Sequence, residues 1–433
     1  MTRRNVLLET ATSSAVVVVA TFVSGVFVAR LLGPEGRGAY GILILAVQIG
    51  FGLGTLSFFD AAVIACSKRP RPQLHAKAMA LVALVIAALS LGAAWILLAM
   101  LGDVAFDVSW SVLVAMGAFM AVEALNRSLY SLELANGDYT HVNRERVIAV
   151  VFFAAIVVGL LAFAVNSVFV TFLGFLASKL PVLALRLRRF ATYLRLRRVS
   201  RPFIANTLHR GLRLHLPYSF SLFAAQADKL IIAAYFATDE FGRYLVAFST
   251  VGVFFSIPFQ VISLIALPEL SRKDQSAVRL KFEKAIRLVL SFSLMLAVVA
   301  AVASYMLIPL FYGAAFASAT SFIVPLAMLM VLINLRNIVV EYLRSQVFWK
   351  LQTAMELAMI GFGATAAFLS NGQIGLFLGG LIAINCVLTA GVLTALARRD
   401  NPVRPSALVP DPAEAWSTVV ALTRTGREWL GRT

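Results

Sequence analysis

The sequence contains few charged residues, few histidines and almost no cysteine. Asp, Glu, Lys and Arg together make up only 14% of its 433 residues, against about 25% in a typical soluble domain. The two cysteines and four histidines lack the spacing of a metal site or a disulfide framework. The sequence also lacks a Walker A motif, a nucleophile elbow and a histidine-based catalytic dyad. We therefore expect no metal, no cofactor and no enzymatic activity.

Hydrophobic side chains are in excess and make up 60% of the chain. A water-soluble protein with this composition would lack the polar residues needed to cover its surface. The long apolar runs do not alternate with polar residues, as the strands of a membrane barrel do. The composition thus predicts an all-α polytopic membrane protein, whose apolar surface is buried in lipid.

The apolar runs are long enough for transmembrane helices, which need about 20 residues each. We predict about 12 such helices in this chain. They cover residues 11–32, 39–65, 78–101, 110–135, 147–165, 168–187, 214–236, 241–268, 282–310, 321–345, 353–370 and 375–397.

The basic residues predict the orientation of these helices. They concentrate in every second connection, and the segment 186–213 alone holds nine arginines and no acid. Because cytoplasmic loops carry an excess of Lys and Arg, both termini are predicted to be cytoplasmic. The net charge of +17 then reflects contact with anionic lipids of the inner leaflet, and no nucleic acid partner is expected.

Two loop patterns recur in the second half of the chain. Residues 35–40 (EGRGAY) resemble 240–244 (EFGRY), and residues 102–106 (GDVAF) resemble 313–316 (GAAF). The order and spacing indicate a parallel duplication of a six-helix bundle, an architecture typical of transporters that work by alternating access. The predicted domains are an N-terminal bundle (1–187), a basic cytoplasmic linker (188–213), a C-terminal bundle (214–397) and a basic cytoplasmic tail with an interfacial helix (398–433).

Three sequence strings carry a resemblance to a known family. They are 29–41 (ARLLGPEGRGAYG), 227–232 (ADKLII) followed by EFGRY, and 311–317 (FYGAAFA). They are similar to patterns of the Wzx-type flippases for lipid-linked oligosaccharides, which belong to the MOP exporter superfamily. The resemblance covers the whole chain and implies a V-shaped MOP-type fold in the bacterial cytoplasmic (inner) membrane.

This resemblance also implies a function. Such flippases move an undecaprenyl-pyrophosphate-linked oligosaccharide from the cytoplasmic to the outer leaflet, for O-antigen, exopolysaccharide or other cell-surface assembly. Their implied partners are the polysaccharide polymerase and glycosyltransferases. Three alternatives stay open: a multidrug or cation antiporter of the same superfamily, a lipid II flippase, and a non-transporting scaffold. An antiporter would need an acidic cavity, and a lipid II flippase typically has fourteen spans.

Polar residues within the predicted spans are the candidate site. Each charge costs roughly 2.5–3.5 kcal/mol to insert, so such residues usually face a cavity or a partner. For the pyrophosphate, we predict Arg127, Lys229, Arg336 and Arg30. For the sugars, we predict the polar wall residues Asn126, Tyr130, Gln260 and Asn334. The candidates for ion coupling are Asp60, Glu123, Asp228 and Glu341.

The fourth predicted span holds the densest polar face. Glu123, Asn126, Arg127 and Tyr130 follow each other at i, i+3, i+4 and i+7, and therefore share one side of a helix. Two interpretations remain open. Glu123 and Arg127 form an ion pair that joins helices, or the face lines a hydrated cavity.

Overall fold

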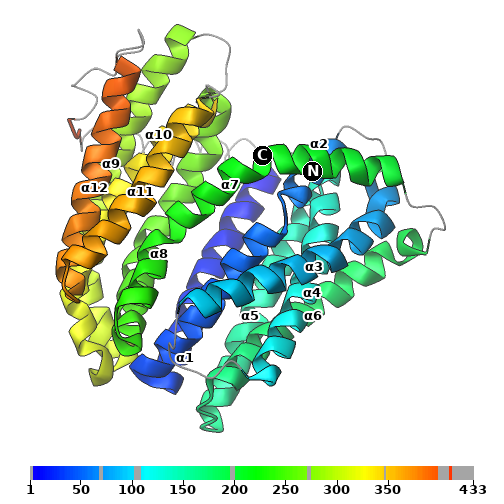
Figure 1. The fold of residues 1–433 in the computed structure, drawn as a ribbon, viewed down its shortest axis with the longest axis horizontal. Helices are drawn as coiled ribbons and strands as arrows, with labels where there is room; N and C mark the ends of the chain where they lie inside the picture. The colour runs from blue at the N-terminus through cyan, green and yellow to red at the C-terminus, as the bar shows by residue number, and fades with distance from the viewer. Residues whose placement is uncertain are drawn as a thin grey trace. The chain divides into compact units, whose positions relative to one another are not determined.

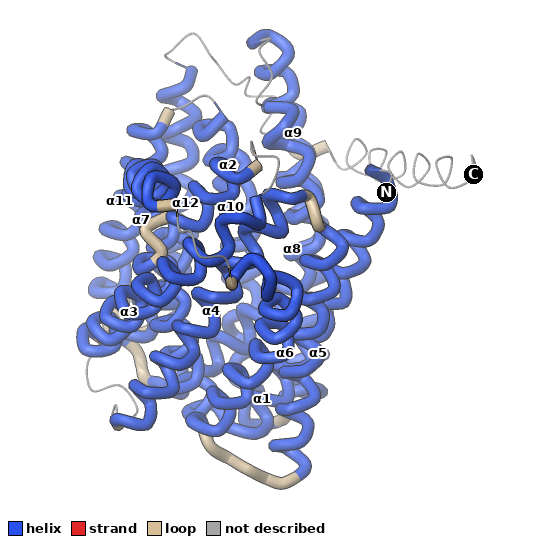
Figure 2. Tube along the Cα trace, turned by 90° about the vertical axis from the view of Figure 1, so that its right-hand side faces the viewer, coloured by secondary structure: helices blue, strands red, loops and turns tan. Residues whose placement is uncertain are grey.

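The computed structural model describes residues 3–67, 72–101, 109–195, 200–270, 275–345, 348–397 and 409–411. Within these residues the secondary structure is entirely helical (Figures 1 and 2). The α-helices are α1 (Arg3–Gly54), α2 (Phe58–Cys66), α3 (Ala76–Met100), α4 (Trp110–Asn136), α5 (Tyr139–Ala162), α6 (Val168–Leu194), α7 (Arg201–Tyr235), α8 (Thr238–Leu270), α9 (Gln275–Leu307), α10 (Ile323–Ser345), α11 (Trp349–Leu369) and α12 (Ile374–Ala397). Short 3₁₀ and π segments cover Pro72–His75, Ile308–Tyr312 and Ala314–Phe322.

Helix α1 consists of two segments joined at a kink at Gly33. The backbone there has φ 68° and ψ −178°, a conformation that only glycine adopts without strain. Pro34 follows directly and cannot donate a backbone hydrogen bond to the preceding turn. The apolar stretch Thr12–Gly54 is 43 residues long, about 65 Å of helix, which is roughly twice the thickness of the hydrocarbon core. The kink therefore falls where the sequence predicts the connection between two spans.

Eight stretches of the described chain are long and apolar enough to cross a membrane. The protein is therefore a polytopic, all-helical membrane protein, as predicted. The predicted spans 214–236, 241–268 and 353–370 are helical as well, in α7, α8 and α11, but they are not among the eight. Polar residues such as Gln226 and Lys229 lower the hydropathy of α7. Twelve crossings therefore stay a prediction.

The helices form two compact units. Unit 1 comprises residues 1–246 with 311–318, and unit 2 comprises 247–310 with 319–433. Helix α7 thus packs with the N-terminal helices. Most of the predicted linker is helical, since residues 188–194 continue α6 and residues 201–213 begin α7.

Large aromatic side chains fill the core of each unit. In unit 1, Phe58, Phe59 and Phe172 are fully buried, and the rings of Phe119 and Phe175 stack with their centroids 5.3 Å apart. In unit 2, the rings of Phe282 and Tyr342 stack at 4.0 Å. Ile286, Ile338, Met355 and Leu396, among others, surround this second pair.

Two of the repeated loop patterns meet within unit 1. A Cβ atom added to Gly38 would overlap the carbonyl oxygen of Thr238, and one added to Gly242 would overlap that of Pro34. The backbones of α1 and α8 therefore touch at this point. Only glycine allows an approach this close.

Candidate functional site

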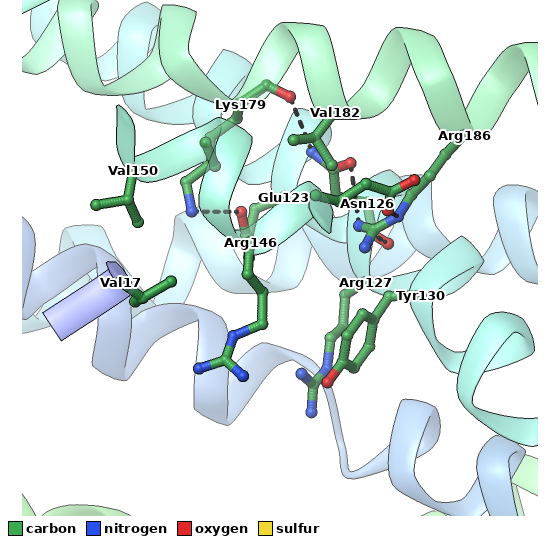
Figure 3. Close-up of a pocket in the computed structure, with 12 residues that line it drawn as sticks. Val17, Glu123, Asn126, Arg127, Tyr130, Arg146, Val150, Lys179, Val182 and Arg186 are labelled. Atoms are coloured by element: carbon green, nitrogen blue, oxygen red, sulfur yellow. Dashed lines mark hydrogen bonds and ion pairs between the residues drawn. The ribbon is translucent and has the colours of Figure 1, made fainter. Parts of the chain in front are cut away.

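The polar face of α4 lines a pocket in unit 1, between α1, α4, α5 and α6 (Figure 3). Its volume is about 280 Å³, near the lower limit of about 300 Å³ for small-ligand pockets. Apolar side chains such as Val17 and Val182 cover part of the wall. The polar residues of the lining are Glu123, Asn126, Arg127, Tyr130, Glu145, Arg146, Lys179 and Arg186.

Bases outnumber acids in this lining. The lining holds the four bases Arg127, Arg146, Lys179 and Arg186, and its two acids are Glu123 and Glu145. Poorly solvated sites strengthen electrostatic interactions relative to bulk water. The lining therefore favours an anion.

Two of these bases have weak, partly exposed ion pairs. The Nζ atom of Lys179 lies 3.6 Å from a carboxylate oxygen of Glu123. A guanidinium nitrogen of Arg127 lies 3.4 Å from Asp60, which belongs to α2. The side chains of Arg127 and Asp60 are 41% and 50% exposed. The two interpretations of the α4 face thus have an answer: it lines a pocket, and Glu123 and Arg127 pair with residues of other helices.

Arg146 differs from the other bases. It is half-buried on α5, and within the described residues it makes no hydrogen bond or ion pair. Figure 3 shows its guanidinium pointing to the same side as that of Arg127, away from Lys179. Its positive charge is therefore not neutralised by the described part of the protein.

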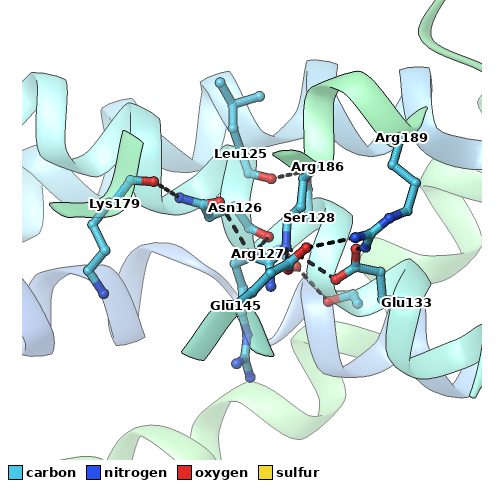
Figure 4. Close-up of polar contacts among 10 residues, drawn as sticks. Leu125, Asn126, Arg127, Ser128, Glu133, Glu145, Lys179, Arg186 and Arg189 are labelled. Atoms are coloured by element: carbon cyan, nitrogen blue, oxygen red, sulfur yellow. Dashed lines mark hydrogen bonds and ion pairs between the residues drawn. The ribbon is translucent and has the colours of Figure 1, made fainter. Parts of the chain in front are cut away.

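A buried ion-pair network adjoins the pocket through Glu145 and Arg186, which belong to the lining (Figure 4). The Nε atom of Arg186 lies 2.8 Å from Glu145 and 3.2 Å from Glu133. Arg189 pairs with the same two carboxylates. Two arginines and two glutamates balance in charge, so this network holds α4, α5 and α6 together without offering a free charge.

Arg186 also orients the α4 face. It donates hydrogen bonds to the backbone oxygen of Asn126 at 3.0 Å and to its Oδ1 atom at 3.3 Å. The Asn126 amide donates in turn to the backbone oxygen of Lys179 at 3.3 Å. The ring of Tyr130 lies between two guanidinium groups, at 5.0 Å from Arg127 and 5.3 Å from Arg186, distances typical of cation–π contacts. These contacts fix where Arg127 stands.

Three other predicted site residues of unit 1 lie outside this pocket lining. Lys229 and Asp228 form an ion pair at 3.6 Å, and the buried Tyr244 hydroxyl donates to Asp228. Arg30 donates from its Nε atom to the backbone oxygen of Phe311. Each of these side chains therefore has a partner within the protein.

The remaining predicted site residues belong to unit 2. Asn334 is buried and donates to Ser293 at 3.2 Å. Arg336 is also buried and donates to Asn385 at 3.2 Å, while Glu341 is half-buried. The side chain of Gln260 lies outside the described residues.

Four polar residues of the pocket lining are not among the predicted site residues. They are Glu145, Arg146, Lys179 and Arg186, of which Arg186 falls in the basic segment 186–213. A signal for two of them exists in the sequence, because Lys179 and Arg186 are seven residues apart and share one face of α6. Arg146 has no comparable signal, since nothing in its spacing indicates which helices α5 contacts.

A comparison with protein-family models shows to which family this chain belongs. The model described as "Polysaccharide biosynthesis protein" matches residues 27–321, more than half of the sequence. The chain belongs to this family. The predicted resemblance to polysaccharide-biosynthesis proteins is thereby confirmed. None of the curated proteins compared with the sequence matches it.

Solved structures of MOP transporters share the fold of this family member. The lipid II flippase MurJ in an inward closed conformation has a TM-score of 0.66 at 12% identity, covering 91% of this chain and 89% of its own. An outward-facing multidrug resistance MATE transporter has a TM-score of 0.59 at 13% identity, and the match covers 90% of this chain and 94% of its own. A MOP superfamily transporter from Pyrococcus furiosus is described as having a binding pocket of reverse polarity. It has a TM-score of 0.51 at 13% identity, and the match covers 90% of this chain and 94% of its own.

Identities this low establish the fold and not the substrate. Family and fold together identify the chain as a polysaccharide-biosynthesis membrane protein with the fold of MOP transporters.

Proposed function

We propose that this transporter flips an undecaprenyl-pyrophosphate-linked oligosaccharide from the cytoplasmic to the outer leaflet of the bacterial inner membrane, by alternating access. In this proposal the chain crosses the membrane twelve times, has both termini in the cytoplasm and serves O-antigen or exopolysaccharide assembly. The membership in a polysaccharide-biosynthesis family supports this substrate class. A polyprenyl pyrophosphate combines an apolar tail, which stays in lipid, with an anionic head, which needs cations.

The observation that carries the proposal is the surplus of bases in the unit 1 pocket. Arg146 makes no ion pair within the described residues, and the ion pair of Arg127 with Asp60 is partly exposed. Arginine guanidinium groups form charge-assisted, bidentate hydrogen bonds with phosphate oxygens, and a phosphate would replace Asp60 as the partner of Arg127. A pocket of about 280 Å³ accommodates a phosphate head but not a whole oligosaccharide, so all but the sugar next to the head lie outside it.

The other predicted residues take secondary roles in this proposal. Lys229, Arg336 and Arg30 contribute positive potential along the path, and Asn126, Tyr130, Gln260 and Asn334 offer polar or aromatic contacts to sugars. Asp60, Glu123, Asp228 and Glu341 are the carboxylates at which ions couple to transport. An inside-negative potential favours outward movement of the anionic head by about 2.3 kcal/mol per charge for each 100 mV.

The test is a flipping assay with purified transporter in proteoliposomes and a defined pyrophosphate-linked oligosaccharide. Arg146→Gln should lower the initial rate about tenfold or more, because a charge-assisted hydrogen bond is worth about 1.5–3 kcal/mol. The matched control is Arg144→Gln. Arg144 lies two residues away on α5, is exposed and does not line the pocket. Equal rates for Arg146→Gln and wild type would contradict the assignment of the pocket.

The same proteoliposomes separate the alternatives. A multidrug or cation antiporter should export organic cations, an activity that the basic pocket disfavours. A lipid II flippase should accept lipid II and reject oligosaccharides that lack the peptide. A scaffold should flip neither substrate, and absence of flipping by the active, correctly inserted protein would overturn the proposal.

A further inference from the structure

The first half of α7 lies across α2 (Figure 1). The surface of this half of the helix has three distinct sides. The side that faces the protein consists of Phe203, Thr207 and Gly211, which are buried and four residues apart. The ring of Phe203 stacks on His75 with a centroid distance of 3.9 Å. A Cβ atom at Gly211 would come within 2.7 Å of the backbone oxygen of Leu56. This half of α7 is therefore firmly seated on the connection between α1 and α2.

The second side of the helix is apolar and exposed. Leu212 is 50% exposed and Leu216 is 64% exposed. With a rotation of about 100° per residue, both lie on the same side as Ala205 and Leu208. The helix already packs against the protein by its first side, so Leu212 and Leu216 have no described partner on this second side. They are placed like the apolar side of a helix that lies in a membrane interface.

The third side is basic. Arg210, Arg213 and His209 lie next to the leucines on the helix surface, whereas Arg201, at the helix start, lies in line with the leucines. All four are exposed. Within the described residues, the three arginines make no ion pair or hydrogen bond from their side chains. The sequence contains no Asp or Glu between residues 146 and 227, so no acid of the same helix segment neutralises them.

We propose that residues 201–216 form an interfacial helix that binds the headgroups of anionic phospholipids. Arg201, Arg210 and Arg213 bind the phosphates, and Leu212 and Leu216 enter the acyl region. We infer that the ligand is a lipid and not an acidic protein, because the basic side adjoins an exposed leucine side. A membrane covers both sides at once, whereas an acidic protein would cover the arginines and leave the leucines exposed. This inference is independent of the proposed substrate, since the helix residues do not line the pocket.

The first experiment measures lipid binding to the full-length protein in detergent by native mass spectrometry. Phosphatidylglycerol and zwitterionic phosphatidylcholine are titrated in parallel. The wild type should bind phosphatidylglycerol more tightly, and the triple variant R201Q/R210Q/R213Q should lose roughly 100-fold at low salt, about fivefold per arginine. Equal affinity of the wild type for both lipids would overturn the proposal.

The matched control removes the same charge from elsewhere. In R144Q/R188Q/R195Q, three exposed arginines of the α5 start and the α6 end are replaced, and lipid binding should change less than threefold. Equal losses in both triple variants would mean diffuse attraction to the basic surface and would contradict a site on α7. Thermal unfolding of each variant verifies that the fold is intact.

The second experiment tests insertion of the leucine side. A fluorophore is attached at Leu212→Cys or at Asn206→Cys in a Cys66→Ser, Cys386→Ser background, and the protein is placed in nanodiscs with brominated acyl chains. The label at position 212 should be quenched at least twofold more than the label at position 206, which lies on the basic side. If the label at position 212 were quenched no more than the label at position 206, or not at all, insertion would be refuted. This outcome does not depend on whether the protein transports its proposed substrate.

Discussion

Arg127 forms its ion pair with Asp60, 67 residues earlier in the chain, at 3.4 Å. Glu123, four residues before Arg127 and on the same helix face, pairs instead with Lys179 at 3.6 Å. The two contacts connect α4 with α2 and with α6. Asp60 is therefore a counter-ion of Arg127 that a phosphate group can replace. Loss of the Arg127–Asp60 pair leaves the Glu123–Lys179 contact intact.

The Arg127–Asp60 pair should contribute little to stability. Both side chains are about half exposed, and exposed pairs are worth about 0–1 kcal/mol. Arg127→Gln and Asp60→Asn should each lower the free energy of unfolding by no more than about 1 kcal/mol, while Arg127→Gln reduces flipping. Thermal unfolding and flipping rates of the two variants and their double variant give the coupling. A coupling of about 3 kcal/mol would mean that Arg127 is mainly structural.

The Arg186 network should behave in the opposite way. Arg186 is 5% exposed, and Glu133 and Glu145 are as deeply buried. Removing one partner of a buried ion pair leaves an uncompensated charge and costs about 3–5 kcal/mol. Arg186→Met should therefore lower thermal stability strongly, whereas Arg188→Met, at an exposed position of the same helix, should not. Similar melting temperatures for the two variants would argue against a structural role of the network.

The helices and part of the site could be predicted from the sequence. Apolar runs identified the long helices but not the helical linker residues 188–194 and 201–213. Helical spacing brought Asn126, Arg127 and Tyr130 to one pocket. Spacing along one helix carries no information on which helices are neighbours, so the partners Asp60 and Lys179 could not be predicted. For the same reason, residues 35–40 and 240–244 were recognised as repeats, but their direct contact through Gly38 and Gly242 was not.

The topology remains a prediction and can be tested by labelling. In a Cys66→Ser, Cys386→Ser background, single cysteines at Ser67 and Arg195 should react only with reagents that enter the cytoplasm. A cysteine at Glu35, which is exposed beside the α1 kink, should react from the opposite side. Labelling of position 195 from outside intact cells would rule out the twelve-span model with cytoplasmic termini.

Deletion of residues 405–433 tests the predicted role of the basic tail, which lies mostly outside the described residues. If the tail only contacts the membrane surface, the truncated protein should insert normally and keep its flipping rate within about twofold of wild type. Membrane abundance is measured alongside flipping. Loss of transport by a correctly inserted truncation would assign the tail a direct role.

The glycine contact between α1 and α8 should tolerate no side chain. A Cβ atom at Gly38 or Gly242 would overlap a backbone carbonyl oxygen, and backbone cannot move aside as the end of a flexible side chain can. Gly38→Ala and Gly242→Ala should therefore each destabilise the protein by about 1–3 kcal/mol, the usual cost of overpacking. The control is Gly25→Ala in α1, where a Cβ atom meets nothing within 4 Å and alanine favours the helix by up to about 1 kcal/mol. Thermal unfolding of the three variants should separate Gly25→Ala, at or above wild type, from the other two. Wild-type stability in Gly38→Ala and Gly242→Ala would mean that the two helices do not touch here.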